Sequence, residues 1–269
     1  MTTTVIARRR RSAVRTEIAS RFRRFRPIGL IAALCLPGGA FAQENDGGWH
    51  YSFTPYLWGA GINGNVATVP GVPETNFDAS FSDILDNLDF GAMAVFRARK
   101  DNFGLFGDLL YIKISAGQGT AGSEYGEAQA DVRNTILTLG GDYVISSNSK
   151  TVIRLAGGLR YWDVKTDLGL TAGTSPAVSG SGSDQWLDAI VGVTWRSDLG
   201  PKTYLTGWAM VGGGGSDHTA DLFAGLGYRF NDRTSLVGGY RYIDVDRRSG
   251  DFVYDVEQQG AMLGVAFAF

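Results

Sequence analysis

Acid–base chemistry is the first function to test in this sequence, because two histidines stand among many carboxylates after residue 42. His50 lies near the start of that region, and His218 lies between Asp217 and Asp221 in a glycine-rich stretch. An Asp–His pair can activate a water or a hydroxyl as a general base. However, adjacent residues in an extended segment point in opposite directions, and we identify no serine partner. We therefore expect no catalytic residues, and a hydrolase that uses His218 and Asp217 is the least favoured function.

Cofactor and metal chemistry are not indicated either. The stretch from Gly59 to Gly64 matches the pattern G-x-G-x-x-G, but no helix is expected to open there and prolines follow. The single cysteine, Cys35, lies before residue 42, so the rest of the chain has no thiol for a disulfide or a metal site. We expect no cofactor and no bound metal.

The more informative residues are charges that recur on one face of strand-like segments. Successive side chains of a strand point to opposite faces. One face is uncharged for four or five positions per segment; it includes Phe90, Leu105, Leu139, Leu155, Val191, Leu226 and Leu263. The opposite face carries charges of both signs: Arg97, Arg99, Asp108, Asp142, Arg154, Arg160, Asp188, Arg196, Arg229 and Arg241. A lipid-facing Arg or Lys at mid-depth costs roughly 2 to 4 kcal/mol, so the apolar face is expected to contact lipid and the charged face a lumen.

Two readings of the inward charges remain open. They can form ion pairs that fill a narrow barrel as a plug, or they can line a charged constriction of a pore formed by Arg97, Asp108, Arg154, Arg160 and Asp188. We favour the plug, because a ten-stranded barrel has little space once arginines, Phe106 and Trp162 point inward.

The elements that would position these charges are antiparallel strands joined by alternating short and long connections. Short turns are expected at residues 100–102, 146–150, 197–202 and 231–233. Longer polar connections are expected at residues 62–89, 115–129, 166–184, 212–219 and 247–251. Outer-membrane barrels have an even strand number, short periplasmic turns and longer outer loops. The fold class is therefore all-β, a closed antiparallel up-and-down transmembrane β-barrel of ten strands, with eight or twelve as alternatives.

One helix-like patch interrupts the first long connection. Phe81, Ile84, Leu85 and Leu88 follow helical spacing and would form one apolar face. We expect this patch to form a lid over the barrel mouth. The alternatives are a position in the lipid headgroup region and ordinary loop packing.

The last segment, residues 252–269, places Phe269, Phe267, Val265 and Leu263 on one face and small residues on the other. It resembles the closing strand of Gram-negative outer-membrane β-barrels. That resemblance implies that Phe269 and Phe267 form a C-terminal assembly signal, with the barrel assembly machinery and periplasmic chaperones as partners.

The first 42 residues are expected to be a cleaved signal peptide. An arginine-rich region precedes the short apolar run 28–36, and Ala40-Phe41-Ala42 supplies a cleavage site. The segment contains nine arginines and one glutamate, which leaves 16 of the 25 basic and 26 of the 27 acidic residues, a net charge of −10. A nucleic-acid partner is not expected for so acidic a chain, because phosphate contacts need clustered Lys and Arg.

Residues 43–269 resemble the opacity-protein-like and OmpA-type barrels of proteobacteria. The resemblance rests on the preceding signal peptide, the strand alternation, the turn pattern and the terminal phenylalanine. The resemblance implies an integral outer-membrane protein in contact with membrane lipid and lipopolysaccharide. The expected function is a non-enzymatic role in envelope structure or surface interaction, and the alternative is a narrow porin-like channel for small solutes.

Overall fold

The computed structural model describes residues 48–120 and 123–269. The expected signal peptide and its cleavage site after Ala42 lie outside the described residues. The described chain is almost entirely β-structure with one short helix, α1 (Phe81–Asp86). The strands are β1 (His50–Ala67), β2 (Thr75–Ala79), β3 (Leu88–Lys100), β4 (Phe103–Gly119), β5 (Tyr125–Ser147), β6 (Thr151–Ala172), β7 (Val178–Asp198), β8 (Thr203–Gly214), β9 (His218–Arg229), β10 (Thr234–Ser249) and β11 (Phe252–Ala268).

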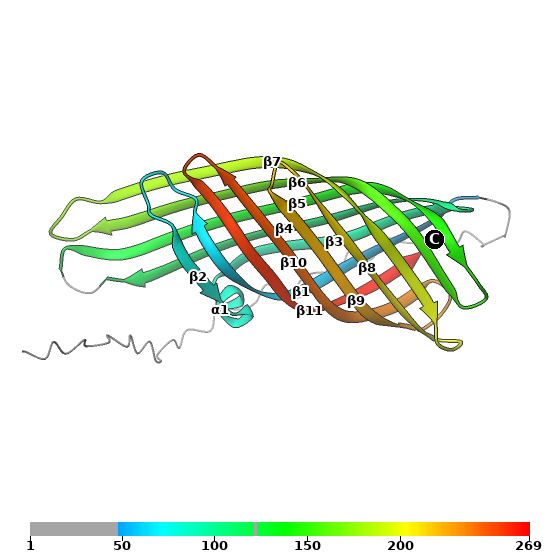
Figure 1. Ribbon diagram of the computed structural model, residues 1–269. Coiled ribbons are helices and arrows are strands. Elements are labelled where there is room, and N and C mark those ends of the chain that lie inside the picture. Colours follow the sequence, from blue (N-terminus) through cyan, green and yellow to red (C-terminus); the bar gives the residue numbers. More distant parts are fainter. Residues whose placement is uncertain (1–47, 121–122) are drawn as a thin grey trace, which may run out of the picture. The chain divides into compact units, whose positions relative to one another are not determined.

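Ten of these strands form a closed antiparallel ring (Figure 1). β3 to β11 each pair with the next strand along the chain, β1 pairs with β3, and β11 returns to pair with β1. The described residues contain eleven strands rather than the ten expected. The additional strand, β2, pairs only with the outer half of β1, from Ile62 to Val66. It was missed because its five residues are mostly exposed and carry no apolar alternation.

The two ends of the barrel differ. At one end, here called the turn end, short turns join β3 to β4, β5 to β6, β7 to β8 and β9 to β10. Tyr51 and Phe269 exchange backbone hydrogen bonds of 2.9 and 3.0 Å at the same end. The opposite end, here called the mouth, carries the remaining connections.

The expectation of long polar loops at the mouth was wrong for four of the five connections. Only residues 215–217 separate β8 from β9, and only residues 250–251 separate β10 from β11. Most of residues 115–129 and 166–184 are strand, because β4 pairs with β5 as far as Gly119 and β6 pairs with β7 as far as Leu170. Gly, Ser and Thr hide the apolar alternation there, but the backbone ladder needs only N–H and C=O groups. β4 to β7 consequently reach further from the ring than β8 to β11 (Figure 1).

The predicted division into an apolar outer face and a charged inner face is confirmed. Large apolar side chains are exposed around the outside of the ring, among them Leu57, Leu105, Leu139, Leu155, Val191, Leu226 and Leu263. Alternate positions on the same strands are buried inside, among them Tyr56, Trp58, Ile136, Trp162, Ile190 and Phe223. Exposed apolar side chains all round a closed sheet are expected when the surrounding solvent is lipid.

The wall between β1 and β3 is paired over a short length only. β1 pairs with β3 from His50 to Pro55, and its outer half pairs with β2 instead. Pro55 lies at the last of these pairs, and it has no N–H to donate to a ladder. β1 and β11, in contrast, are in register from Ser52 to Ala67, with an interruption at Thr54 and Pro55.

The helix α1 lies outside the ring and not across the mouth, so the structure contradicts the expected lid of Phe81, Ile84, Leu85 and Leu88. Gly59 belongs to the outward face of β1, and a Cβ built on it would lie 3.4 Å from the Phe81 ring. Phe81 and Leu85 remain 44 and 47% exposed. Phe81 therefore packs on the outer wall, and none of the six residues of α1 is buried.

A different part of the same connection enters the mouth. Val69 is buried at 4% exposure, and a Cβ on Gly182 of β7 would lie 1.8 Å from the carbonyl oxygen of Thr68. Gly182 lies on the inward face of β7, on the same side as Trp186. The turn that follows β1 thus packs on the inner surface of β7, where only glycine leaves room for its backbone.

Candidate functional site

Two arginines and two aspartates form an ion-pair network at mid-height in the lumen. Asp221 accepts hydrogen bonds from Arg241 Nε at 3.1 Å and Nη2 at 2.8 Å, and also from Arg160 Nη2. Arg241 also donates to Asp108 and, at 2.7 Å, to the Tyr56 hydroxyl, which itself donates to Asp108 at 2.8 Å. Arg160, Arg241 and Asp221 are 1 to 2% exposed. The charges cancel, which is the condition under which ion pairs are tolerated in an interior.

Five strands supply this network, because it is built from inward positions of β1, β4, β6, β9 and β10. Aromatic rings surround the Arg241 guanidinium, whose Cζ lies 5.3 Å from the Trp58 ring centroid and 5.2 Å from that of Trp208. The Trp208 Nε1–H also donates to Asp221 at 2.8 Å. Cation–π contacts of this kind add to the ion pairs in desolvated surroundings.

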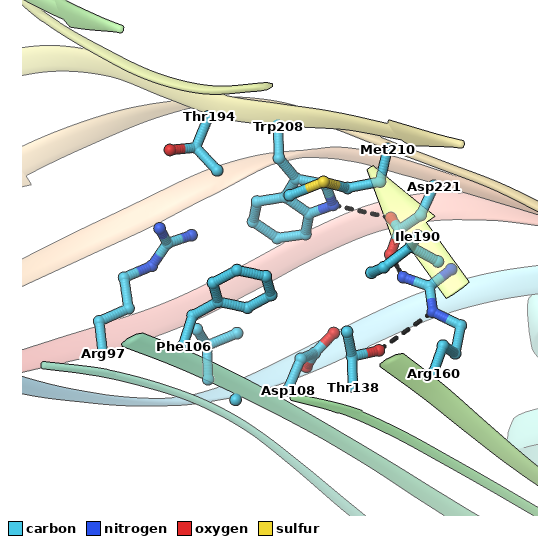
Figure 2. A pocket seen from close by; sticks show the side chains of 12 residues that line it. Arg97, Phe106, Asp108, Thr138, Arg160, Ile190, Thr194, Trp208, Met210 and Asp221 are labelled. Atoms are coloured by element: carbon cyan, nitrogen blue, oxygen red, sulfur yellow. Dashed lines mark hydrogen bonds and ion pairs between the residues drawn. The ribbon is translucent and has the colours of Figure 1, made fainter. Parts of the chain in front are cut away.

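Little open space remains beside the network. Figure 2 shows a cavity bounded by Asp221, Arg160 and Thr138 on one side and by Arg97 on the other, with Phe106 and Trp208 projecting between them. Its volume is about 30 Å³. A cavity of this size holds about one or two water molecules. It leaves no room for a solute at this level.

The mouth side of the network is filled by apolar side chains. Trp162 and Trp186 stack with ring centroids 5.5 Å apart and an interplanar angle of 10°, and Tyr254 lies 6.1 Å from Trp186. Val164, Ile243, Val245 and Val256 are at most 1% exposed around them. Arg247 Nε bonds Asp184 at 2.9 Å, and its Cζ lies 5.7 Å from the Trp186 ring. This tier is packed like the core of a soluble protein.

The turn-end side of the lumen is positively charged. Five arginines lie there: Arg97, Arg99, Arg154, Arg196 and Arg229. Arg154 pairs with Asp142 at 2.9 Å, and Arg196 and Arg229 both reach Asp198. Within the described residues neither Arg97 nor Arg99 belongs to an ion pair, and the buried Arg99 Nε has no hydrogen-bond acceptor. Five positive charges against two negative ones give this tier a net positive field.

The structure therefore places all ten expected lumen charges on the inward face but divides them between levels. Arg160, Asp108 and Arg241 belong to the central network, and Arg97, Arg99, Asp142, Arg154, Arg196 and Arg229 to the turn-end tier. Asp188 is fully buried between the central and mouth tiers, where its Oδ1 accepts the Ser216 N–H at 2.7 Å. The set expected to line one constriction, Arg97, Asp108, Arg154, Arg160 and Asp188, does not form a single ring.

The histidine–aspartate pair in the structure differs from the expected pair of His218 and Asp217. His218 Nε2 lies 3.1 Å from Asp244 Oδ2 on β10 and is not paired with Asp217. Register explains this, because His218 sits beside the Asp244–Asp246 stretch of β10 at the start of β9. Both side chains share the outward face with Tyr240 and Leu222, and the His218 side chain is 55% exposed. This geometry provides no nucleophile and no enclosed site.

Sequence reasoning missed three members of the central network. Asp221 was considered only as a neighbour of His218, but it lies within β9, and its buried side chain faces inward while the adjacent Leu222 faces outward. Tyr56 and Trp208 were not selected, although both fall on the inward face of their strands. The alternation of Asp221 with Leu222 and Ala224 could have identified it; nothing in the sequence indicated that β1 and β10 meet at the same level.

The C-terminal residues close the ring at the turn end. Phe267 aligns with Phe53 of β1, and the rings of Tyr51 and Phe269 stack 5.9 Å apart. Their role as an assembly signal remains a prediction. Among the described residues no helix is long and apolar enough to cross a membrane. No group of three or more His, Cys, Asp or Glu that could hold a metal ion occurs in the same part of the chain.

A closed antiparallel ring, an outer surface of exposed apolar side chains and a filled lumen define an integral β-barrel of the outer membrane. Comparison with solved structures agrees with this class. The outer-membrane protease OmpT of Escherichia coli matches with a TM-score of 0.53 at 8% identity, over 85% of this chain and 99% of that one. The translocator domain of the autotransporter NalP from Neisseria meningitidis matches with a TM-score of 0.43 at 16% identity, over 84 and 90%. Ail of Yersinia pestis matches with a TM-score of 0.36 at 15% identity, over 82 and 98%.

The likeness to OmpT shows the fold, that of the outer-membrane β-barrels of Gram-negative bacteria. No family model matches the sequence, and no curated protein matches it. The solved neighbours have different roles, namely protease, autotransporter translocator and attachment protein, so the role of this chain must be argued from its own residues.

Proposed function

We propose that this chain is a non-enzymatic outer-membrane barrel with a lumen closed to solutes, and that its role lies in envelope structure or surface contact. The observation that carries the proposal is the filled lumen. A neutral network of Arg160, Arg241, Asp221 and Asp108 occupies its middle, and a stacked pair of tryptophans occupies the mouth side. The cavity of about 30 Å³ between them and the turn end is too small for a solute.

The orientation follows the general rule for such barrels, in which short turns face the periplasm. The mouth and the long hairpins of β4 to β7 would then face the exterior. Beyond the ring these strands present backbone edges and polar side chains to the surroundings, and exposed edges of this kind can pair with a strand of another protein. This extension supports a role in surface contact.

Single-channel recording in planar bilayers tests the proposal. The refolded protein should give no discrete conductance steps. The W162A/R241A variant is the positive control, because it removes one large side chain from the mouth side and one from the central network. Discrete steps from this folded variant would show that the recording detects an inserted barrel. Discrete steps from the unmodified chain would support the porin-like alternative and contradict the proposal.

The porin-like channel is less favoured because the central network fills the lumen between the turn-end arginines and the mouth, so no continuous pore passes through the barrel. The rim hydrolase is less favoured because His218 and Asp244 face outward. Unchanged proteolytic or esterolytic background in H218A would agree with a non-enzymatic role, and loss of a measurable activity in that variant would contradict it.

A further inference from the structure

A row of three cations crosses the outer wall of β4, β5 and β6. Lys113 is aligned with Arg133, and Arg133 is aligned with Lys165, in adjacent antiparallel strands. Their outward direction follows from their neighbours, because Asn134, Val164 and Thr166 at alternate positions are buried inside. Directly aligned side chains on one face have Cβ atoms about 4.5 to 5.5 Å apart. The three positive groups are therefore held side by side by the backbone register.

The row lies just beyond the apolar belt. On β4, Tyr111 precedes Lys113 by two residues, which is about 7 Å along a strand. On β6, Tyr161 precedes Lys165 by four residues and is followed by Asp163. Tyrosines mark the boundary between hydrocarbon and headgroups in barrels. The cations consequently face the layer where lipid phosphates lie.

The row lines a surface pocket in which, within the described residues, Arg133 and Asp131 are the two charges outside any ion pair; with Asp89 and Asp167 counted, the cations and carboxylates balance. Lys113, Arg133 and Lys165 form a pocket of about 160 Å³ together with Asp131, Val132 and Asp167. Lys113 bonds Asp89 at 3.1 Å, and Lys165 bonds Asp167 at 3.3 Å, which neutralises the two flanking lysines. Asp131 accepts the Ser115 hydroxyl. Within the described residues Arg133 is exposed and belongs to no ion pair, so its planar guanidinium is available for a bidentate oxyanion contact.

The opposite wall carries carboxylates in place of cations just beyond its tyrosine. Just beyond Tyr242, the outward positions of β10 and β11 are Asp244 and Glu257, which are aligned with each other. A lipid phosphate would meet only carboxylates at these two positions, whereas β4, β5 and β6 offer it cationic hydrogen-bond donors. The asymmetry distinguishes the cation row from basic residues scattered around a rim.

We propose that Lys113, Arg133 and Lys165 form a binding site for the phosphate of an outer-leaflet glycolipid, with Arg133 as the principal contact and the lysines as additional donors. The inference rests on the orientation proposed above, with the mouth toward the exterior. It specifies lipopolysaccharide, an expected partner, by the phosphate on its lipid and places it on one side of the barrel. It does not depend on whether the lumen conducts.

The test is binding of bis-phosphorylated lipid A to the full barrel refolded in non-ionic detergent, measured by native mass spectrometry. The expected result is about tenfold weaker binding in R133Q, because glutamine cannot replace the charge-assisted hydrogen bonds of the guanidinium. K113Q/R133Q/K165Q should lose more, and R133K should recover part of the loss. The matched control K100Q/K150Q/K202Q removes three exposed lysines from the turn end and should bind like the unmodified chain.

Two further ligands separate the sources of the phosphate. Lipid A stripped of both phosphates should bind the unmodified chain as weakly as phosphorylated lipid A binds the triple variant. Equal binding of both lipids, or equal losses in the triple variant and its control, would overturn the proposal. Inorganic phosphate that competes at the same concentration as the lipid would assign the site to the free ion and overturn the lipid source. The heat-dependent gel mobility of each variant verifies folding, and conductance recordings test the closed lumen separately.

Discussion

Removing the Asp221 carboxylate charge should strongly destabilise the barrel. Asp221 is 1% exposed and is the shared acceptor of Arg160, Arg241 and Trp208. D221N keeps the shape of the side chain but leaves two buried arginines with one aspartate, Asp108. Breaking a buried ion pair from one side costs about 3 to 5 kcal/mol, because the remaining charge has no counter-charge. We expect a loss of this size in the free energy of unfolding.

Urea unfolding of the refolded protein in lipid vesicles, followed by tryptophan fluorescence, measures this loss. The matched control is D232N, which removes a carboxylate from an exposed turn and should change stability by less than about 0.5 kcal/mol. The double variant R160Q/D221N restores neutrality and should lose less than the sum of its single variants. A loss in D221N no larger than that in D232N, or strict additivity in the double variant, would refute a central network held by charge balance.

Three further predictions concern the mouth and its connections. W162A removes a fully buried ring and should destabilise by about 3 to 5 kcal/mol in the same urea assay, whereas a loss below about 1 kcal/mol would contradict a packed mouth tier. G182A places a methyl group 1.8 Å from the Thr68 carbonyl oxygen and should release the turn after β1, seen as faster amide hydrogen exchange at Val69; unchanged exchange would oppose this docking. The Ser80 hydroxyl, and then its backbone N–H, hold the pKa of Asp83 below its ordinary value of 3.8. The capping box of α1 is thus complete at neutral pH and is lost as the pH falls through the lowered pKa of Asp83. Amide exchange in α1 should then accelerate relative to the pH trend of the strands, and S80A should remove that pH step.

The ring of strands and the face of each strand that contacts lipid could be predicted from the sequence alone. Alternation of Leu139 with Thr138, or of Leu226 with Gly225, is a local property of a strand, and a charge such as Arg160 identifies the inward side without any knowledge of its partners. The ten strands of the ring follow from this alternation and the turn residues.

The site could not be predicted to the same extent, because its members meet through ring closure. Asp221 and Arg160 are 61 residues apart, and Arg241 and Tyr56 are 185 residues apart. Their shared level depends on the stagger between strands, which alternation does not determine. Connections were also unreliable: the polar residues of β5 and β6 beyond the ring resemble loop sequence, although their backbones continue the sheet.

The short β1–β3 contact distributes the cost of closing the ring unevenly. Six residue pairs, from His50↔Arg99 to Pro55↔Ala94, join strands only 39 to 49 positions apart, whereas fourteen pairs join β1 to β11 across 186 to 216 positions. Closing the longer span costs about 1.4 kcal/mol more in chain entropy. The longer register more than compensates for this small difference. The β1–β3 wall is therefore the first to separate under thermal or mechanical stress, although its strands are close in sequence. The first and last strands of the chain, β1 and β11, remain paired.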